Sequence, residues 1–175
     1  MLKKPKPIPI KTIEIEVALA RFFNYRTSVI VPNISWGFKW MHECDMFILR
    51  KSGYAIEVEI KISKANLKAD FKKGHDHKSK YIREFYYAFP KQFYEEFLPL
   101  IPEHAGIITC EKFCPKDYAP YIVTQVRRKA KINTGALKLS DKDRIKISHL
   151  GTMRIWSAKA KEIKLNEKII ELKNK

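Results

Sequence analysis

The stretch HECDMFILRKSGYAIEVEIKIS, residues 42–63, constrains the fold more than any other, because its side-chain pattern predicts a β-hairpin. An apolar run follows Asp45 and ends in the polar turn Arg50–Gly53, whose glycine suits a positive φ. In the returning strand, isoleucine and valine side chains alternate with three charged residues on the other face: Glu57, Glu59 and Lys61. The hairpin would therefore bring two carboxylates and one ammonium together with Asp45.

This pattern allows two interpretations. An amphipathic surface strand would show the same alternation, with its charges in solvent. The spacing also resembles the PD-(D/E)XK nuclease superfamily, in which an Asp opens one strand and Glu-x-Lys closes the next. That resemblance implies that Asp45 and Glu59 bind Mg²⁺ or Mn²⁺ and that Lys61 helps to position or polarise the attacking water. The chemistry suits these residue types, because Mg²⁺ takes oxygen ligands and needs only one or two carboxylates when it is held against a phosphate.

The residues after the hairpin make the resemblance more specific. The chain continues with SKANLKADFK at 63–72 and FYYAFP at 85–90. Together with EIK at 59–61, these segments are similar to the MmcB-like DNA repair family, a branch of the same superfamily, over residues 43–109. The resemblance implies an α/β restriction-endonuclease-like core, with a central mixed β-sheet flanked by helices, and a role on DNA. Three positions depart from the family pattern, all of them in or next to the helix that follows the hairpin: Asn66, Leu67 and Lys73.

Further residues are candidates for the site, each with an alternative. Many PD-(D/E)XK enzymes carry a glutamate on the first helix that completes the metal site. Glu16 lies on one face with Ala20 and Phe23 and is the candidate here, although acidic residues are also common at helix starts. Asp70 and Lys72 would be either active-site support or exposed charges. Glu57 would be either an additional metal-site carboxylate or a charge at the rim.

The remaining elements follow from periodicity and from turn residues. Strands are predicted at Ser28–Val31 (closed by Pro32), Phe85–Phe89, Ala105–Cys110 and Tyr121–Val126. Helices are predicted at Thr12–Tyr25, Ser63–Lys73, Gln92–Phe97 and Asp141–Ile163, the last with Leu150, Met153 and Trp156 as its apolar spine and a frayed tail. The chain would be a single nuclease-like domain of 175 residues, with an extended arm (1–11), a core (12–126) and a basic helical extension (127–175).

The formal net charge of +16 is concentrated near the C-terminus. Residues 112–175 hold 17 Lys or Arg and 6 Asp or Glu, a net charge of +11. Nucleic acid is the expected partner, because Lys and Arg neutralise phosphates without reading sequence; the alternative is a highly charged, soluble surface. The densest basic cluster is expected to hold the DNA backbone: Arg127, Arg128, Lys129 and Lys131.

Three cysteines, Cys44, Cys110 and Cys114, cannot all pair with one another, which favours a reduced compartment and no disulfide partner. The Pro-rich N-terminus resembles neither a signal peptide nor a membrane span. We therefore expect a cytoplasmic protein of a bacterium or a phage-infected host.

Two functions are compatible with these features. The first is a metal-dependent DNA endonuclease in repair, recombination or phage DNA processing, and a homodimer would suit double-strand cleavage. The second is a non-catalytic DNA-binding repair accessory protein that retains the nuclease fold. Retention of Asp45, Glu59 and Lys61 favours the first, because carboxylates in a phosphate groove repel the ligand unless they do chemistry.

Overall fold

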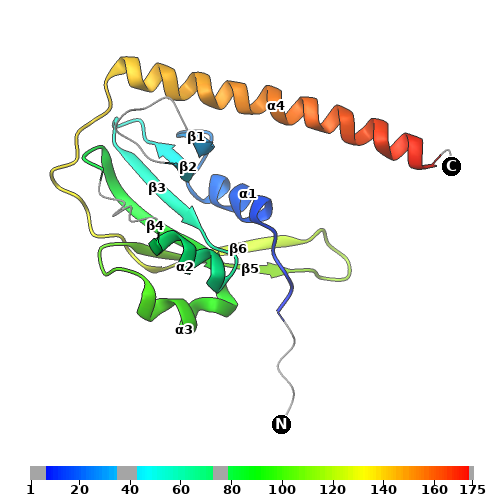
Figure 1. Ribbon diagram of the computed structural model, residues 1–175, viewed down its shortest axis with the longest axis horizontal. Helices are drawn as coiled ribbons and strands as arrows, with labels where there is room; N and C mark the ends of the chain where they lie inside the picture. Colours follow the sequence, from blue (N-terminus) through cyan, green and yellow to red (C-terminus); the bar gives the residue numbers. More distant parts are fainter. Residues whose placement is uncertain (1–6, 35–42, 73–78, 174–175) are drawn as a thin grey trace, which may run out of the picture.

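Six strands form one mixed β-sheet in which the spatial order follows the chain order (Figure 1). The computed structural model describes residues 7–34, 43–72 and 79–173. The strands are β1 (Val29–Ile34), β2 (Cys44–Leu49), β3 (Ala55–Ile60), β4 (Ile82–Pro90), β5 (Gly106–Phe113) and β6 (Tyr121–Arg128). β4 pairs in parallel with β3 and β5, and the other pairs are antiparallel. The expected α/β class with a mixed sheet is confirmed.

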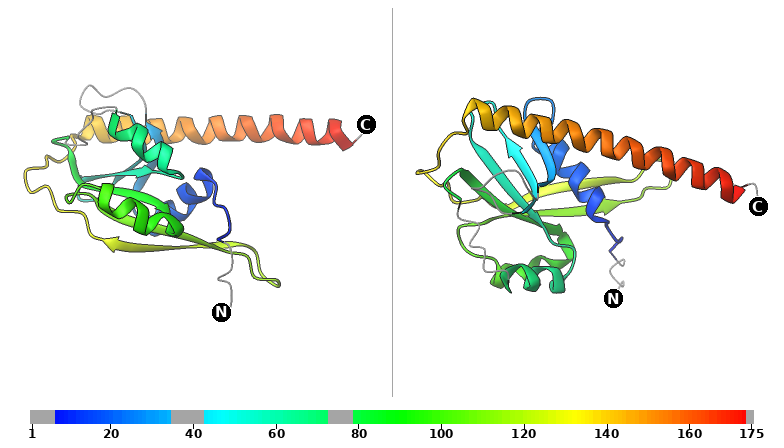
Figure 2. Two further views of the ribbon diagram at one scale, coloured as in Figure 1. Left: turned by 60° about the horizontal axis from the view of Figure 1, so that its bottom comes forward. Right: turned by 45° about the horizontal axis from the view of Figure 1, so that its top comes forward.

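Helices cover both faces of this sheet (Figure 2). The helices are α1 (Thr12–Phe22), α2 (Lys64–Lys72), α3 (Tyr94–Phe97) between 3₁₀ turns at Lys91–Phe93 and Leu98–Leu100, and α4 (Asp141–Lys173). α1 packs Ile15 and Leu19 against one face. α2, α3 and the beginning of α4 pack Leu67, Phe97 and Ile147 against the other. The sheet is therefore the middle of three layers.

The hairpin of β2 and β3 has the predicted geometry. Phe47 lies opposite Glu57 in the antiparallel register, and Gly53 in the turn has φ +87°. Side chains of alternate residues enter the two cores, so all six residues of β3 are buried. The alternation predicted this strand, but both of its faces are covered, and the interpretation as a solvated surface strand is wrong.

Three predicted boundaries are wrong at strands, one of them the end of β5, which continues past Cys110 to Phe113. β1 continues through Pro32 to Ile34, because β1 is an edge strand in which a proline without an N–H is tolerated. Arg127 and Arg128 belong to β6 and not to a helical extension, which begins only at Asp141.

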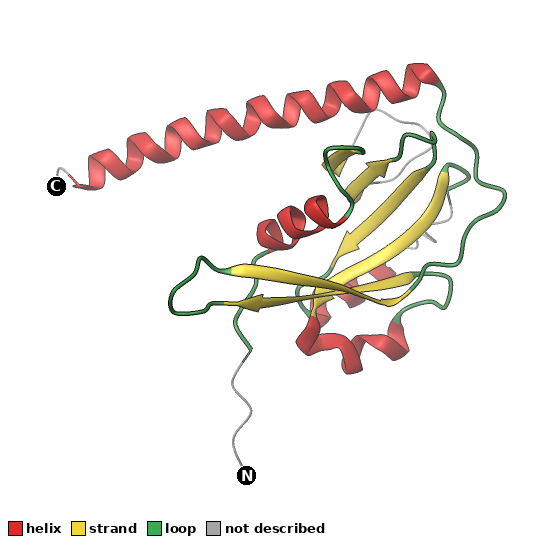
Figure 3. Cartoon of the chain, turned by 180° about the vertical axis from the view of Figure 1, so that it is seen from behind, coloured by secondary structure: helices red, strands yellow, loops and turns green. Residues whose placement is uncertain are grey.

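The C-terminal helix is longer than the sequence predicted and largely uncovered. It begins after Ser140, whose Oγ accepts the Asp143 N–H at 3.2 Å, and it continues to Lys173 without the expected fraying. Gly151 permits a close approach to β1, since a Cβ there would lie 3.3 Å from Val31 Cγ2. After Leu150 the helix has no buried residue and projects beyond the sheet (Figure 3), so Met153 and Trp156 do not form a buried spine.

The described residues include no helix that is long and apolar enough to cross a membrane. All three cysteines have free thiols: Cys44 and Cys110 are buried, whereas Cys114 is exposed.

Candidate active site

The hairpin brings Asp45, Glu59 and Lys61 together at the end of β2–β3 that lies away from the turn. The backbone N–H of Ile60 donates to Asp45 Oδ2 at 2.7 Å, and the N–H of Asp45 donates to Glu59 Oε1 at 3.4 Å. Lys61 Nζ lies 2.6 Å from Glu59 Oε2 and 3.8 Å from Asp45 Oδ2. The predicted juxtaposition of these three residues is therefore present.

Asp70 from α2 is a fourth member of the cluster. Lys61 Nζ donates to Asp70 Oδ1 at 2.8 Å, and the Tyr87 hydroxyl donates to Asp70 Oδ2 at 3.0 Å. Only 8% of the Lys61 side chain is exposed, because Glu59 and Asp70 enclose its ammonium. The alternative in which Asp70 is an exposed charge is wrong.

The sequence of α2 explains how Asp70 reaches the cluster. Ser63 caps the helix as predicted, with its Oγ accepting the Asn66 N–H at 3.2 Å. Leu67 is fully buried against the sheet, and Asp70 follows one turn later on the same side of the helix. Lys72 lies in the last turn of α2, and its side chain is outside the described part of the structure.

Tyr87 was not predicted to belong to the site. It stands beside Glu59 in the parallel register of β3 and β4. The alternation of Phe85, Tyr87 and Phe89 could have indicated that its side chain shares the face of Glu59, but only once the pairing of the two strands is known.

The cluster has more negative than positive charge. Glu57, two residues before Glu59 on the same face, is fully buried, so the alternative that places it at the rim is wrong. Among the described residues, four carboxyl groups, those of Asp45, Glu57, Glu59 and Asp70, thus accompany the ammonium of Lys61. If all were ionised, these carboxylates would carry four negative charges beside the one positive charge of Lys61.

Proton affinities follow from this imbalance. Burial raises the pKa of Glu59 to about 7; the charge of Asp45 raises it as well, whereas Lys61 acts in the opposite direction. Burial alone would lower the pKa of Lys61, but Glu59 and Asp70 together outweigh it and raise that pKa. Burial and the neighbouring Asp70 also raise the pKa of the Tyr87 hydroxyl. Under neutral conditions Lys61 is therefore charged, and Glu59 is poised between its two protonation states.

The donor set fits a hard divalent cation held by two carboxylates. The side chain of Asp45 is 34% exposed, so one edge of the cluster is open to solvent, and Glu59 lies directly behind it. Two carboxylates suffice for Mg²⁺ when water and phosphate oxygens complete its shell. Within residues 7–34, 43–72 and 79–173, however, no three His, Cys, Asp or Glu side chains are arranged to hold a metal ion.

Glu16 does not join Asp45 and Glu59. Its carboxylate accepts a hydrogen bond from Asn33 Nδ2 at 3.2 Å, and no ion pair or hydrogen bond links it to the cluster among the described residues. α1 packs on the opposite face of the sheet from Glu59. Glu14, on the same helix, is paired with Lys112.

The predicted basic cluster is only partly available to a partner. Arg128 donates to the carbonyl oxygens of Ala105, Ile101 and Pro102 at 2.9, 3.3 and 2.7 Å, and Arg127 donates to Thr109 Oγ1 at 3.1 Å. Both guanidinium groups are thereby engaged within the fold. Lys129 is exposed, and Lys131 is exposed and paired with Glu103 at 3.2 Å.

Comparisons with known proteins bear on the fold alone. No family model matches the chain, and no curated protein matches it. A solved structure, the SPO1766 protein of unknown function from Silicibacter pomeroyi, superposes with a TM-score of 0.57 over 91% of this chain and 96% of that chain. The two sequences are 17% identical, so the similarity shows a shared α/β fold and nothing about activity.

Proposed function

We propose that this protein is a metal-dependent DNA endonuclease with a restriction-endonuclease-like core of the PD-(D/E)XK type. The observation that carries the proposal is the meeting of Asp45, Glu59 and Lys61 at one end of the hairpin, with an excess of carboxylates and one solvent-exposed edge. Such an arrangement costs stability, because buried carboxylates repel one another, and it is therefore typical of functional sites. The free thiols suit a reduced compartment such as the cytoplasm.

Each residue has a distinct role in this proposal. Asp45 and Glu59 would hold Mg²⁺ or Mn²⁺, which supplies Lewis acidity and an acidified water when bound. Asp45 is oriented by the Ile60 N–H, and the second Glu59 oxygen is held by Lys61. Asp70 and Tyr87 keep the Lys61 ammonium within reach of Glu59. Lys61 would stabilise negative charge that develops on the phosphate oxygens.

A second candidate is a DNA-binding accessory protein without cleavage. What favours it is the enclosure of Lys61 between Glu59 and Asp70, which keeps the ammonium from solvent and hence from an approaching phosphate. In this alternative the cluster would be a structural polar network.

Cleavage assays with a matched variant test the proposal. Supercoiled, linear, branched and single-stranded DNA are incubated with the purified protein in Mg²⁺ or Mn²⁺, beside Glu59→Gln and an exposed control, Glu103→Gln. We expect cleavage by the wild type and the control and none by Glu59→Gln. Equal cleavage by all three proteins would indicate a contaminating nuclease, and DNA binding without cleavage would support the accessory function.

Metal binding provides a readout that is independent of cleavage. A ligand at 100 times its Kd stabilises the folded state by about 2.7 kcal/mol. Mg²⁺ or Mn²⁺ should therefore raise the thermal midpoint of the wild type and of Glu103→Gln, but not that of Glu59→Gln. Identical responses of all three would contradict the assignment of Glu59 as a ligand.

A further inference from the structure

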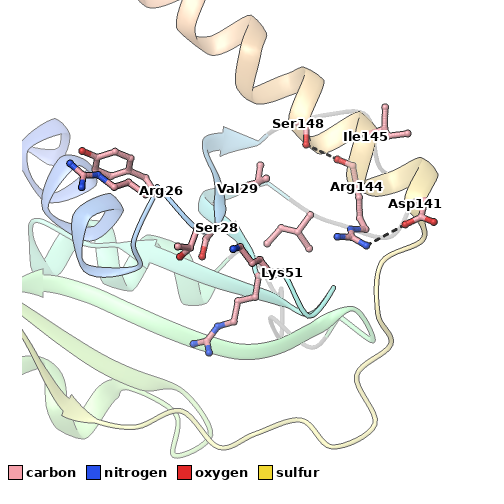
Figure 4. A pocket seen from close by; sticks show the side chains of 12 residues that line it. Arg26, Ser28, Val29, Lys51, Asp141, Arg144, Ile145 and Ser148 are labelled. Carbon is pink, nitrogen blue, oxygen red and sulfur yellow. Dashed lines mark hydrogen bonds and ion pairs between the residues drawn. The ribbon is translucent and has the colours of Figure 1, made fainter.

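Two adjoining hollows lie at the turn end of the β2–β3 hairpin, away from the acidic cluster. The larger, of about 750 Å³, is bounded by the loop after α1, the hairpin turn and the first turns of α4 (Figure 4). The smaller, of about 600 Å³, shares Thr27, Ser28, Arg50 and Lys51 with it and continues to Phe22. We refer to the two together as the turn-end groove.

The turn-end groove is strongly basic. Its lining holds four cations, Arg26, Arg50, Lys51 and Arg144, and one carboxylate, Asp141. In Figure 4, Arg144 extends from α4 towards the hairpin turn that carries Lys51, while Arg26 lies on the α1 side.

Two of these cations have no carboxylate partner among the described residues. Arg144 is paired with Asp141 at 3.3 Å, and Arg50 with Glu84 at 3.4 Å. Arg26 and Lys51 form no ion pair with any residue in the described ranges. Cations gathered in one hollow repel one another, and an anion that enters between them removes this repulsion.

Exposed aromatic rings accompany the charges. Tyr25 lines the larger hollow and is 56% exposed, and Phe22 lines the smaller and is 41% exposed. Phe22 is supported edge-on by Phe23 at a centroid distance of 5.0 Å. Grooves that bind single-stranded nucleic acid combine such rings, on which unpaired bases stack, with cations along the backbone. In a duplex the base faces are already stacked, so these rings would have no partner.

We propose that the turn-end groove binds single-stranded DNA, with Arg26 and Lys51 on the phosphates and with Tyr25 and Phe22 stacked on bases. Asp45 lies four strand residues before Leu49, which lines the groove, so the two are about 13 Å apart. The groove therefore holds the strand at a distance from the acidic cluster. This inference shares with the proposed function only its partner, DNA, and requires neither a metal ion nor Glu59.

Salt-dependent binding tests the phosphate contacts. Fluorescence anisotropy of a labelled oligo(dT) of about twelve nucleotides is measured in EDTA over a series of salt concentrations. The Arg26→Gln/Lys51→Gln variant is compared with Lys159→Gln/Lys161→Gln, which removes the same charge from the exposed part of α4. Loss of two contacts should reduce the slope of log K against log salt by about 1.4, at about 0.7 per contact, and the control should retain the wild-type slope.

Substitution of Tyr25 tests the stacking. Tyr25→Ala should weaken oligo(dT) binding at least about fivefold and leave binding to a duplex of the same length unchanged. Equal losses for both DNAs would overturn the assignment to single strands. The thermal midpoints of all variants are compared, and because every replaced side chain is exposed, they should match the wild type.

The proposed DNA binding by the groove and the proposed nuclease activity can be refuted separately. DNA cleavage by the wild type together with an unchanged salt slope in Arg26→Gln/Lys51→Gln would overturn the groove alone. Binding of oligo(dT) that depends on Arg26 and Lys51, without cleavage of any DNA, would overturn the proposed nuclease activity alone. Absence of any oligo(dT) binding by the wild type would also overturn the groove.

Discussion

The protonation of Glu59 should make the stability of this protein depend on pH in a defined direction. Burial raises the pKa of Glu59 from an ordinary 4.5 to about 7 in the folded state. Between these two values the folded protein holds a proton that the unfolded chain has released. The contribution of the Glu59 carboxyl to the free energy of unfolding is therefore fully present below pH 4.5 and is lost as the pH rises through 7.

The size of this effect follows from the difference in pKa. A difference of 2.5 pH units corresponds to about 3 kcal/mol, at about 1.4 kcal/mol per unit. Glu59→Gln keeps the shape of the side chain and removes the titration. Urea unfolding followed by circular dichroism, in EDTA at pH 5 and pH 8, should show the wild type losing about 2.5 kcal/mol relative to this variant, because part of the stabilisation is already lost at pH 5.

An exposed carboxylate provides the control for the same experiment. Glu103→Gln removes one negative charge from a side chain that is 90% exposed and should follow the wild type at both pH values. The comparison cancels the background slope from the other titrating groups, since they are common to all three proteins. Parallel pH dependence in the wild type and in Glu59→Gln would refute the reasoning.

Three other outcomes are expected. Lys61→Met removes an ammonium that pairs with Glu59 and Asp70 in the buried cluster and should lower the free energy of unfolding by about 3–5 kcal/mol at pH 8, and by less at pH 5, as measured in urea. Gly106→Ala should lower it by about 1–3 kcal/mol, because a Cβ there would lie 2.3 Å from a tyrosine ring and 2.7 Å from a backbone nitrogen; calorimetry measures this. A thiol reagent should label Cys114 alone in the native state, because Cys44 and Cys110 are buried, and burial raises the pKa of Cys110 to about 12; labelling of all three before unfolding would contradict the packing.

The part of the site that could be predicted is the part set by local geometry. Alternation in β3 fixed the face on which Glu59 and Lys61 lie, and the turn at Gly53 fixed the register that opposes them to the start of β2. Both signals lie within about twenty residues, and neither depends on how distant segments pack.

The part that could not be predicted depends on tertiary packing. Asp70 is buried because Leu67 sets the rotation of α2 on the sheet, and no charge pattern within the helix reveals that rotation. Arg128 looks like a phosphate ligand in the sequence, but three carbonyl groups from residues 101–105 surround it once β5 and β6 pair. A run of basic residues specifies charge, and only the fold decides which of those charges reach solvent.

The order of the strands has a consequence for how this chain matures. Since each strand pairs with its predecessor, a chain that emerges from the ribosome can add β2 to β1, β3 to β2 and so on, without waiting for a distant partner. The acidic cluster can close when β4 brings Tyr87 to Asp70, before β5, β6 and α4 take their places. The last helix then returns to cover β1, the first strand made. Synthesis would thus complete the acidic cluster first and add α4, the helix that covers β1, last.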